Sequence, residues 1–255
     1  MNSIFFNNGF SASSGLDIGK KRNSNQDRII FCPDMGFFSV IDGMGGLLHG
    51  GETAEIITEI LPGAVREILE NNEINKKNDS ETALIIKKRI QEISDIIYNT
   101  SNKDDFQYGA TISCLLLLND SAIFVNLGDS RAYLLPRNSW ILRQITEDHN
   151  LAAELVRLGA LTHDEARNHS SSSILTRFAG MTAPSDPDCF IESISPGDRI
   201  LLCSDGMHGM ADETVLKILM RSSRNSETVC RRLIETANEA GGRDNISVVY
   251  IKIEK

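Results

Sequence analysis

The sequence lacks the features that mark several large classes of protein. Its 255 residues contain no apolar run near the 18 or so residues of a membrane-spanning helix, and the N-terminus has no basic start of a secretion signal. Its six prolines and 19 glycines form no linker-like or low-complexity stretch. We therefore expect an ordinary folded protein of the cytoplasm, with no membrane partner.

Positive charge is scarce and spread along the chain. The sequence has 26 Lys and Arg against 35 Asp and Glu, which gives a formal net charge of −9. A protein of this sign without a basic stripe repels a nucleic-acid backbone, so nucleic acid is excluded as a partner class. The excess acid either solubilises the surface or gathers at a cation site.

Paired cysteines and nucleotide motifs are also missing. The five cysteines are odd in number and far apart, without the spacing of a zinc or dithiol site, and we expect reduced, mostly buried thiols. There is no Walker-type phosphate loop, and "GMGG" lacks the glycine spacing of a dinucleotide fingerprint. The sequence thus gives no support to a zinc centre or a nucleotide cofactor.

Apolar runs bounded by turn residues predict the strands. The nearly continuous run "GFFSVID" is typical of a strand buried on both faces, and Asn119–Asp120 between two apolar runs is typical of a tight hairpin. The predicted strand segments are "GLDIG", "RIIFC", "GFFSVID", "ATISCLLLL", "SAIFVNLG", "RAYLLP", "SWILRQIT", "RILLCSD" and "NISVVYIKI".

Apolar residues at spacings of three and four predict the helices. One begins near Glu52 and should kink or break at Pro62. A second follows the polar connector 70–81. Its predicted apolar stripe is Leu84, Ile86, Ile90, Ile93 and Ile97.

Three further helical segments are predicted towards the C-terminus. Residues 150–168 should form a helix with Leu151, Leu155 and Leu158 on one face and Gly159 as a stop, followed by a mobile loop at 170–173. The other helices are expected near 212–221 and 226–240.

The order of these elements favours a layered α+β fold. Neighbouring antiparallel strands and grouped helices argue against alternating strand–helix units, and no repeat or linker divides the chain. We expect a loose N-terminus over residues 1–14 and one domain over residues 15–255.

Four acids stand beside predicted strands, at Asp27, Asp42, Asp205 and Asp244. Each alone is better explained as turn chemistry, but four such sites weaken that interpretation. If the strand ends meet, carboxylates at short range oppose one another's ionisation, and a cation must offset them. Carboxylates and a backbone carbonyl such as that of Gly43 suit Mg²⁺ or Mn²⁺.

The ordered motifs "RNSNQD", "VIDGMGG", "GATIS", "GDSRAYLL", "TEDHN", "ILLCSDG" and "GGRDNISVV" resemble those of the metal-dependent protein phosphatases, the protein phosphatase 2C family, in its compact bacterial branch. The resemblance covers roughly residues 15–253. It implies a four-layer α-β-β-α sandwich, in which two antiparallel sheets are flanked by helix pairs.

The resemblance also implies a centre of two Mn²⁺ or Mg²⁺ ions. Asp42 would bridge the ions, Asp205 and Asp244 would bind one, and the carbonyl of Gly43 would bind the other. Asp27 would hold coordinated waters. A hydroxide bound at this centre would attack the phosphorus in line.

Two further residues take roles from the same resemblance. Arg22 would grip the substrate phosphate with its planar guanidinium. Asp129 matches a position that binds a third ion together with Asp205, although a structural turn is the alternative. Asp164, in a segment that resembles a mobile flap, is a weaker candidate for that ion and is left out of the site.

The chain departs from the family pattern at several positions. Gln26 stands where an acid often precedes Asp27, and Met44 replaces a histidine proposed as general acid in animal relatives. Gly209 removes a further acid, the neighbouring His208 is expected to face solvent, and the loop "GGLLHGGE" looks one residue longer than usual.

Other notable side chains have plainer interpretations. We expect a hydrogen-bonding role for His149, a rim position for His49, and surface positions for His163 and His169. The aromatic residues expected in the core or on strands are Trp140, Phe37 and Phe38.

The sequence therefore predicts a monomeric phosphatase that hydrolyses phosphoserine and phosphothreonine in proteins, with a Ser/Thr kinase and its substrates as implied partners. Two alternatives stay open: a catalytically idle module that binds phosphoproteins, and a phosphoesterase of small molecules.

Overall fold

Antiparallel strands in two sheets form the centre of the molecule. The computed structural model describes residues 9–44, 46–70, 78–101, 109–167, 169–182 and 184–254. The first sheet has the order β1 (Phe10–Asp17), β11 (Ile246–Ile253), β10 (Arg199–Cys203), β7 (Arg131–Leu135) and β8 (Arg143–Gln144). The second has the order β2 (Asp27–Cys32), β3 (Phe37–Met44), β5 (Ile112–Leu118), β6 (Ser121–Leu127) and β9 (Asp188–Ser193), with β4 (Gly109–Ala110) paired to β3.

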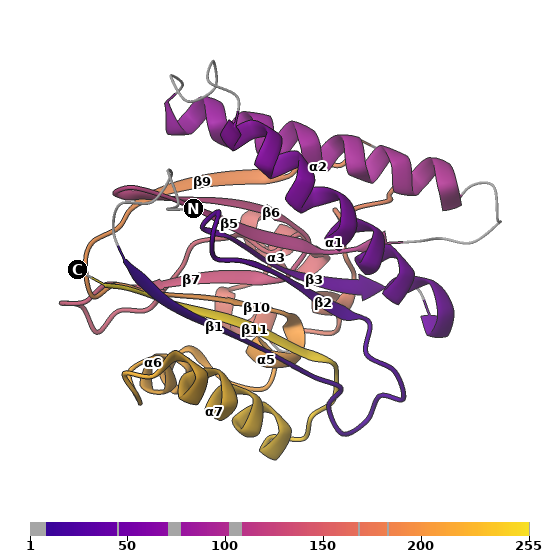
Figure 1. Ribbon diagram of the computed structural model, residues 1–255. Coiled ribbons are helices and arrows are strands. Elements are labelled where there is room, and N and C mark those ends of the chain that lie inside the picture. Colours follow the sequence, from indigo (N-terminus) through magenta and orange to yellow (C-terminus); the bar gives the residue numbers. More distant parts are fainter. Residues whose placement is uncertain are drawn as a thin grey trace.

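Helices cover the outer face of each sheet (Figure 1). The long helices α1 (Gly46–Glu70) and α2 (Asp79–Ser101) lie over the second sheet, and α6 (Glu213–Met220) and α7 (Ser226–Glu239) lie over the first. The short elements are α3 (Leu151–Arg157), α4 (His163–Arg167), the 3₁₀ helix η1 (Ser170–Ser173) and α5 (Asp205–His208). No helix in the described part of the chain is long and apolar enough to cross a membrane.

Three buried apolar clusters lie between these four layers. One joins α1 and α2 to the second sheet, one fills the space between the sheets, and one joins the first sheet to α5, α6 and α7. The predicted α+β, four-layer α-β-β-α sandwich is confirmed.

The strand β3 shows how sequence pattern produces the layers. Because successive side chains point to opposite faces, Phe37 and Ile41 enter the cluster under the helices, whereas Phe38 and Val40 enter the cluster between the sheets. Every residue from Phe37 to Ile41 is fully buried. The prediction of a strand covered on both faces is confirmed.

The hairpin between β5 and β6 also forms as predicted. Leu118 pairs with Ser121, and Asn119 adopts a positive φ of 29°, which asparagine tolerates better than most residues. This hairpin places the end of β6, and the turn that follows it, at the same edge of the sheet as the end of β3.

Several expectations about local structure are wrong. Strand β1 begins at Phe10, so residues 10–14 are not loose, while residues 1–8 lie outside the described part. Helix α1 starts at Gly46 and continues through Pro62 without a break, so described residues of "GGLLHGGE" belong to a helix rather than a loop. The serines at 170–173 form η1, capped by the His169 side chain, rather than a mobile loop.

The segment 139–168 differs most from its prediction. Only Arg143–Gln144 of "SWILRQIT" is a strand, and two short helices, α3 and α4, replace the one predicted near 150–168. The first ends just before Gly159, where φ is 73°, so the predicted stop at Gly159 is confirmed. Trp140 is 69% exposed instead of buried in the core. The apolar stripes are also imperfect, because Leu84 and Leu158 face solvent.

We predict that Phe38→Ala lowers the free energy of unfolding by about 3–5 kcal/mol, because it leaves a cavity between the two sheets. Phe38 is fully buried and packs edge-on against Phe10 and Phe31. The matched control Leu84→Ala, on the exposed face of α2, should stay within about 0.5 kcal/mol of the parent. Urea unfolding followed by circular dichroism measures both, and equal losses would contradict the layer assignment.

Candidate active site

A cavity of about 340 Å³ opens where the ends of β3, β6, β10 and β11 meet. Six of the seven predicted site residues line it: Arg22, Asp42, Gly43, Asp129, Asp205 and Asp244. The seventh, Asp27, is fully buried and pairs in register with Asp42 across β2 and β3. The structure therefore brings together residues that lie more than 200 positions apart in the chain.

Two hydrogen bonds to Thr111 hold the backbone of Asp42. Its carbonyl accepts a hydrogen bond from the Thr111 amide at 2.8 Å, and its own amide donates to the Thr111 hydroxyl at 3.2 Å. That hydroxyl lies 2.7 Å from the Ser130 hydroxyl, next to Asp129 in the turn after β6. These contacts fix the position of the Asp42 backbone relative to the neighbouring turn.

Asn245 fastens the N-terminal loop to the start of β11. Its side-chain amide donates to the carbonyls of Ile18 and Ser24 at 3.0 Å, and its oxygen accepts from the Gln26 amide at 2.8 Å. The loop that carries Arg22 is thereby held beside Asp244. The motif "GGRDN" indicated Asp244 but not this role of its neighbour, which only the long-range contacts reveal.

The turn that carries Asp129 is fixed by two histidines. The Gly128 amide donates to Nδ1 of His149 at 3.0 Å, and Nε2 of His149 lies 2.9 Å from Asp188. The predicted hydrogen-bonding role of His149 is confirmed. His208 was expected to face solvent, and this is wrong because its Nε2 bonds the Asp129 carbonyl at 3.0 Å.

Burial and mutual repulsion disfavour negative charge in this cavity. Burial, with Asp27 and Asp205 nearby, raises the pKa of Asp42 well above its usual value, and burial with Asp205 does the same for Asp129. Burial also raises the pKa of Asp27 to about 6, and burial together with Asp244 raises that of Asp205 to about 6.

The donor set fits divalent cations such as Mn²⁺ and Mg²⁺. Both carboxylate oxygens of Asp27 and one of Asp205 are buried without a hydrogen-bond partner, and buried carboxylate oxygens left so are costly unless a proton or cation satisfies them. Within the described ranges, no group of three or more His, Cys, Asp or Glu side chains is arranged as a metal cluster. The fit therefore rests on oxygen chemistry and burial.

Arg22 extends over the cavity and pairs with Asp244. Its guanidinium lies 2.6 Å from the carboxylate, with the Arg22 side chain 50% exposed and the Asp244 side chain 31% exposed. The hydrogen bond to Asp244 raises the pKa of Arg22 further. Asp244 thus contacts Arg22, the residue predicted to bind the substrate phosphate, and also lies near Asp205.

Gly43 is required by a close approach of two backbones. A Cβ at Gly43 would lie 2.1 Å from the carbonyl oxygen of Gly50 in α1, and a Cβ at Gly50 would lie 2.7 Å from the Gly43 carbonyl carbon. Gly43 and Gly50 thus serve the contact between β3 and the helix that follows it.

The residues that depart from the family pattern fall in different places. Met44 and Gln26 line the cavity, and Gly209 caps α5. Asp164 is exposed on α4 and is not among the lining residues, and the side chain of His49 lies outside the described part. His163 is exposed as expected.

Sequence reasoning missed several lining residues. Asn23, Ser24 and Thr111 come from motifs that were recognised without these roles, whereas Ser173 and Leu175 come from η1 and its end. No periodicity or charge pattern marked Ser173 and Leu175, because their place at the cavity depends on how the chain folds back after α3 and α4.

The pattern of the family described as protein phosphatase 2C matches residues 19–247. The chain belongs to the protein phosphatase 2C family. As a member of this family it is a phosphoprotein phosphatase, and the resemblance of the motifs is confirmed.

Relatives and solved structures agree with this assignment. The chain is 34% identical over 215 residues to the serine/threonine phosphatase Stp of Listeria welshimeri serovar 6b, covering 84% of this chain and 82% of that protein. The structure of serine/threonine phosphatase Stp1 from Staphylococcus aureus superposes with a TM-score of 0.87 at 26% identity, over 99% of this chain and 98% of that one.

A third comparison concerns the fold alone. The catalytic domain of the serine/threonine phosphatase PstP superposes with a TM-score of 0.79 at 23% identity, over 96% of this chain and 99% of that one. That protein was solved in complex with two manganese ions.

We predict that Asp27→Asn stabilises the chelator-treated protein at pH 7.5 by about 1–3 kcal/mol. Because the pKa of Asp27 is raised to about 6, its ionised form costs stability above that pH, and the cost vanishes below its unfolded value of about 3.9. The gain over the parent should therefore shrink as the pH falls from 6 to 4. Urea unfolding at a series of pH values measures it.

The same variant provides the complementary measurement with metal. Saturating Mn²⁺ should raise the melting temperature of the parent more than that of Asp27→Asn, since the cation removes the cost that the substitution removes. Equal shifts in both proteins, or a gain that is independent of pH, would show that Asp27 does not interact with the cation.

Proposed function

We propose that this protein hydrolyses phosphoserine and phosphothreonine in other proteins by in-line attack of a water-derived hydroxide, within one catalytic domain over residues 15–255. The observation that supports this proposal most strongly is the cavity lined by Arg22 and by four partly or fully buried acids near the ends of β3, β6, β10 and β11. The names of relatives as serine/threonine phosphatases support the choice of substrate.

We assign the predicted roles to the residues of this cavity. Asp42, Asp205, Asp244 and the Gly43 carbonyl would hold two divalent ions, and Asp129 with Asp205 a third. When bound, a pair of such ions would neutralise the carboxylates and the phosphate and would lower the pKa of water towards about 7. Hard oxygen donors and the two manganese ions of PstP support Mn²⁺ or Mg²⁺.

The chain's own groups bind the substrate and orient water. The guanidinium of Arg22 presents two parallel N–H donors, which match two oxygens of a phosphate monoester. The buried oxygens of Asp27, which have no hydrogen-bond partner among the described residues, would accept hydrogen bonds from water beside Asp42. Met44 at the rim carries no transferable proton, so the leaving hydroxyl takes its proton from water or from another acid.

The shape of the cavity favours a phosphorylated side chain on a flexible segment. Arg22 is half exposed, and the hollow is small beside a protein surface, so an extended peptide could present its phosphate without unfolding a domain. A Ser/Thr kinase and its substrates are the partners we propose. The monomeric state and the cytoplasmic location stay predictions.

We predict Mn²⁺-dependent release of phosphate from phosphothreonine peptides, lost with chelator and reduced at least about 100-fold by Asp42→Asn or Asp205→Asn. The matched control is Asp34→Asn, which removes an exposed carboxylate paired with Arg66. Phosphate release by a colorimetric assay measures all four proteins, and full activity in either cavity variant would contradict the proposal.

A substrate panel separates the two alternatives. Phosphopeptides should be hydrolysed with a higher kcat/KM than sugar phosphates and nucleotides, and the reverse order would identify a small-molecule phosphoesterase. Binding of phosphopeptides without turnover at any metal concentration would identify an idle binding module.

Arg22→Ala should lower kcat/KM for a phosphothreonine peptide by about 10- to 100-fold, through loss of charge-assisted hydrogen bonds worth about 1.5–3 kcal/mol. A rise in KM alone would indicate binding shared by ground and transition states, and a fall in kcat would indicate binding in the transition state. Arg22→Lys should recover little, because an ammonium cannot form the paired contact. Unchanged kinetics would remove Arg22 from the site.

A further inference from the structure

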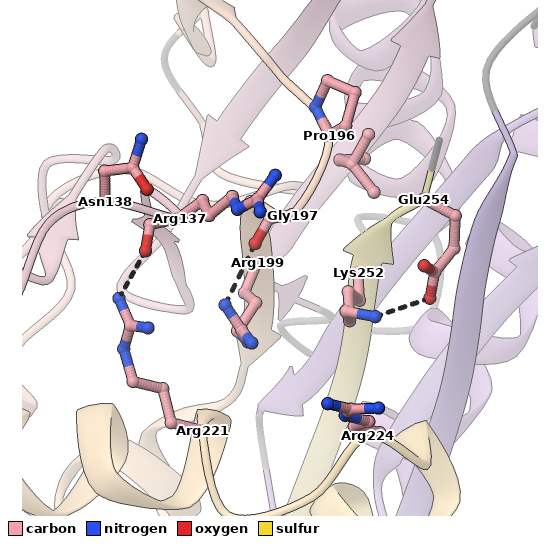
Figure 2. A pocket seen from close by; sticks show the side chains of 10 residues that line it. Arg137, Asn138, Pro196, Gly197, Arg199, Arg221, Arg224, Lys252 and Glu254 are labelled. Atoms are coloured by element: carbon pink, nitrogen blue, oxygen red, sulfur yellow. Dashed lines mark hydrogen bonds and ion pairs between the residues drawn. The ribbon is translucent and has the colours of Figure 1, made fainter.

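A second cavity lies at the other end of β10 and β11. It has a volume of about 650 Å³, and its lining includes Arg137, Arg199, Arg221, Arg224, Lys252 and Glu254 (Figure 2). We call it the arginine pocket. In the pairing of β10 with β11, Arg199 faces Lys252, whereas the acidic cavity lies beyond Cys203 at the opposite end. About 20 Å of strand separates the two sites.

The charge of the arginine pocket is opposite to that of the chain. Four arginines and a lysine share it with one acid, in a protein whose formal net charge is −9. Lys252 pairs with that acid, Glu254, at 2.8 Å. Among the described residues, none of the four arginines forms a salt bridge, so their charge is not neutralised from within the protein.

Backbone carbonyls hold two of these arginines in place. Arg221 donates to the carbonyls of Pro136, Arg137 and Ser139, and Arg199 donates to that of Gly197 at 3.0 Å. Carbonyls fix the position of a guanidinium but do not cancel its charge. The Nε atoms of Arg199 and Arg221 are buried with no hydrogen-bond partner, which leaves two donors unsatisfied.

The arginines also repel one another. Burial and the nearby charge of Arg199 lower the pKa of Arg221, a direction that an anion between them would reverse. Arg137 lies with its aliphatic stem over Gly197, where a Cβ would come within 2.5 Å of it, and Arg224 reaches the pocket from the loop between α6 and α7. The positive groups therefore reach one hollow from separate parts of the chain.

We propose that the arginine pocket is a second anion-binding site, which takes a small molecule that carries a diphosphate or longer phosphate chain. Phosphate oxygens match the forked donors of arginine, and several guanidiniums in one hollow suit more than one phosphate group. The volume is in the range of small-molecule sites, about 300–1,000 Å³, and exceeds that of a single phosphate.

The rest of the surface argues for a compact ligand. An extended polyanion such as nucleic acid would meet the net negative charge of the chain outside the pocket, whereas a short phosphate chain would contact the arginines alone. This proposal does not depend on the function proposed for the acidic cavity, because the two sites share no lining residue.

The single tryptophan of the chain provides a local readout. Cζ of Arg221 lies 4.7 Å from the centre of the Trp140 ring, so an anion bound at Arg221 should change Trp140 fluorescence. The probe is methylenediphosphonate, whose P–C–P bridge a phosphatase does not hydrolyse. It is titrated into the full chain without added Mn²⁺, because a diphosphonate chelates divalent cations, and isothermal titration calorimetry provides a second measurement.

We expect saturable binding, with Kd raised at least about tenfold in Arg137→Gln and in Arg224→Gln, because each exposed arginine contributes charge-assisted hydrogen bonds. The matched control is Arg231→Gln, on the exposed side of α7 and paired with Glu235, which should bind like the parent. Arg22→Ala should also leave the Trp140 response unchanged, since it alters only the acidic cavity.

Three results would overturn the proposal. The first is the absence of binding in both measurements up to about 10 mM probe, and the second is equal loss in Arg231→Gln and Arg224→Gln, which would indicate diffuse charge. The third is a peptide with two phosphothreonines that binds through Arg224 more tightly than the diphosphonate. That last result would assign the pocket to a phosphorylated protein instead of a small molecule.

Discussion

The burial of several carboxylates close to one another is the constraint on which the rest of this structure depends. Asp42 and Asp205 line one cavity, Asp27 is buried opposite Asp42 on the neighbouring strand, and each of the three has a pKa raised by burial and by its neighbours. Such a group costs folding free energy near neutral pH unless a cation accompanies it, so the surrounding fold must supply the difference. Three apolar clusters between four layers do so, and they hold the strand ends that carry the acids.

Local patterns predicted most of this architecture, because strand alternation and helical spacing report which side chains are covered. These patterns gave wrong predictions where the burial of a side chain depends on packing against an element far away in the sequence. Trp140 and Leu158 follow apolar patterns, yet they lie on a segment outside the two sheets with nothing over them. The prediction for His208 was wrong in the opposite sense. This polar residue, expected at the surface, turns inward and bonds the carbonyl of Asp129.

The candidate site was predicted through its motifs rather than its geometry. The acids beside strands could be read from the sequence, but their proximity depends on pairing between strands far apart in the chain, such as β1 with β11. The same dependence hid Asn245, Ser173 and Leu175, which reach the cavity only through long-range contacts. The arginine pocket was invisible for this reason too, because its four arginines are scattered along the sequence.

The contact between Gly43 and Gly50 couples the start of α1 to the backbone at the edge of the acidic cavity. The helix has 25 residues and extends about 37 Å from its start, and its buried face packs over β2, β3 and β4 of the second sheet. The backbones of Gly43 and Gly50 approach closely with no side chain between them. A displacement of one of them is therefore not absorbed by a change of side-chain rotamer. A shift at the start of α1 would therefore move the carbonyl of Gly43, and a shift of Gly43 would in turn move the start of the helix.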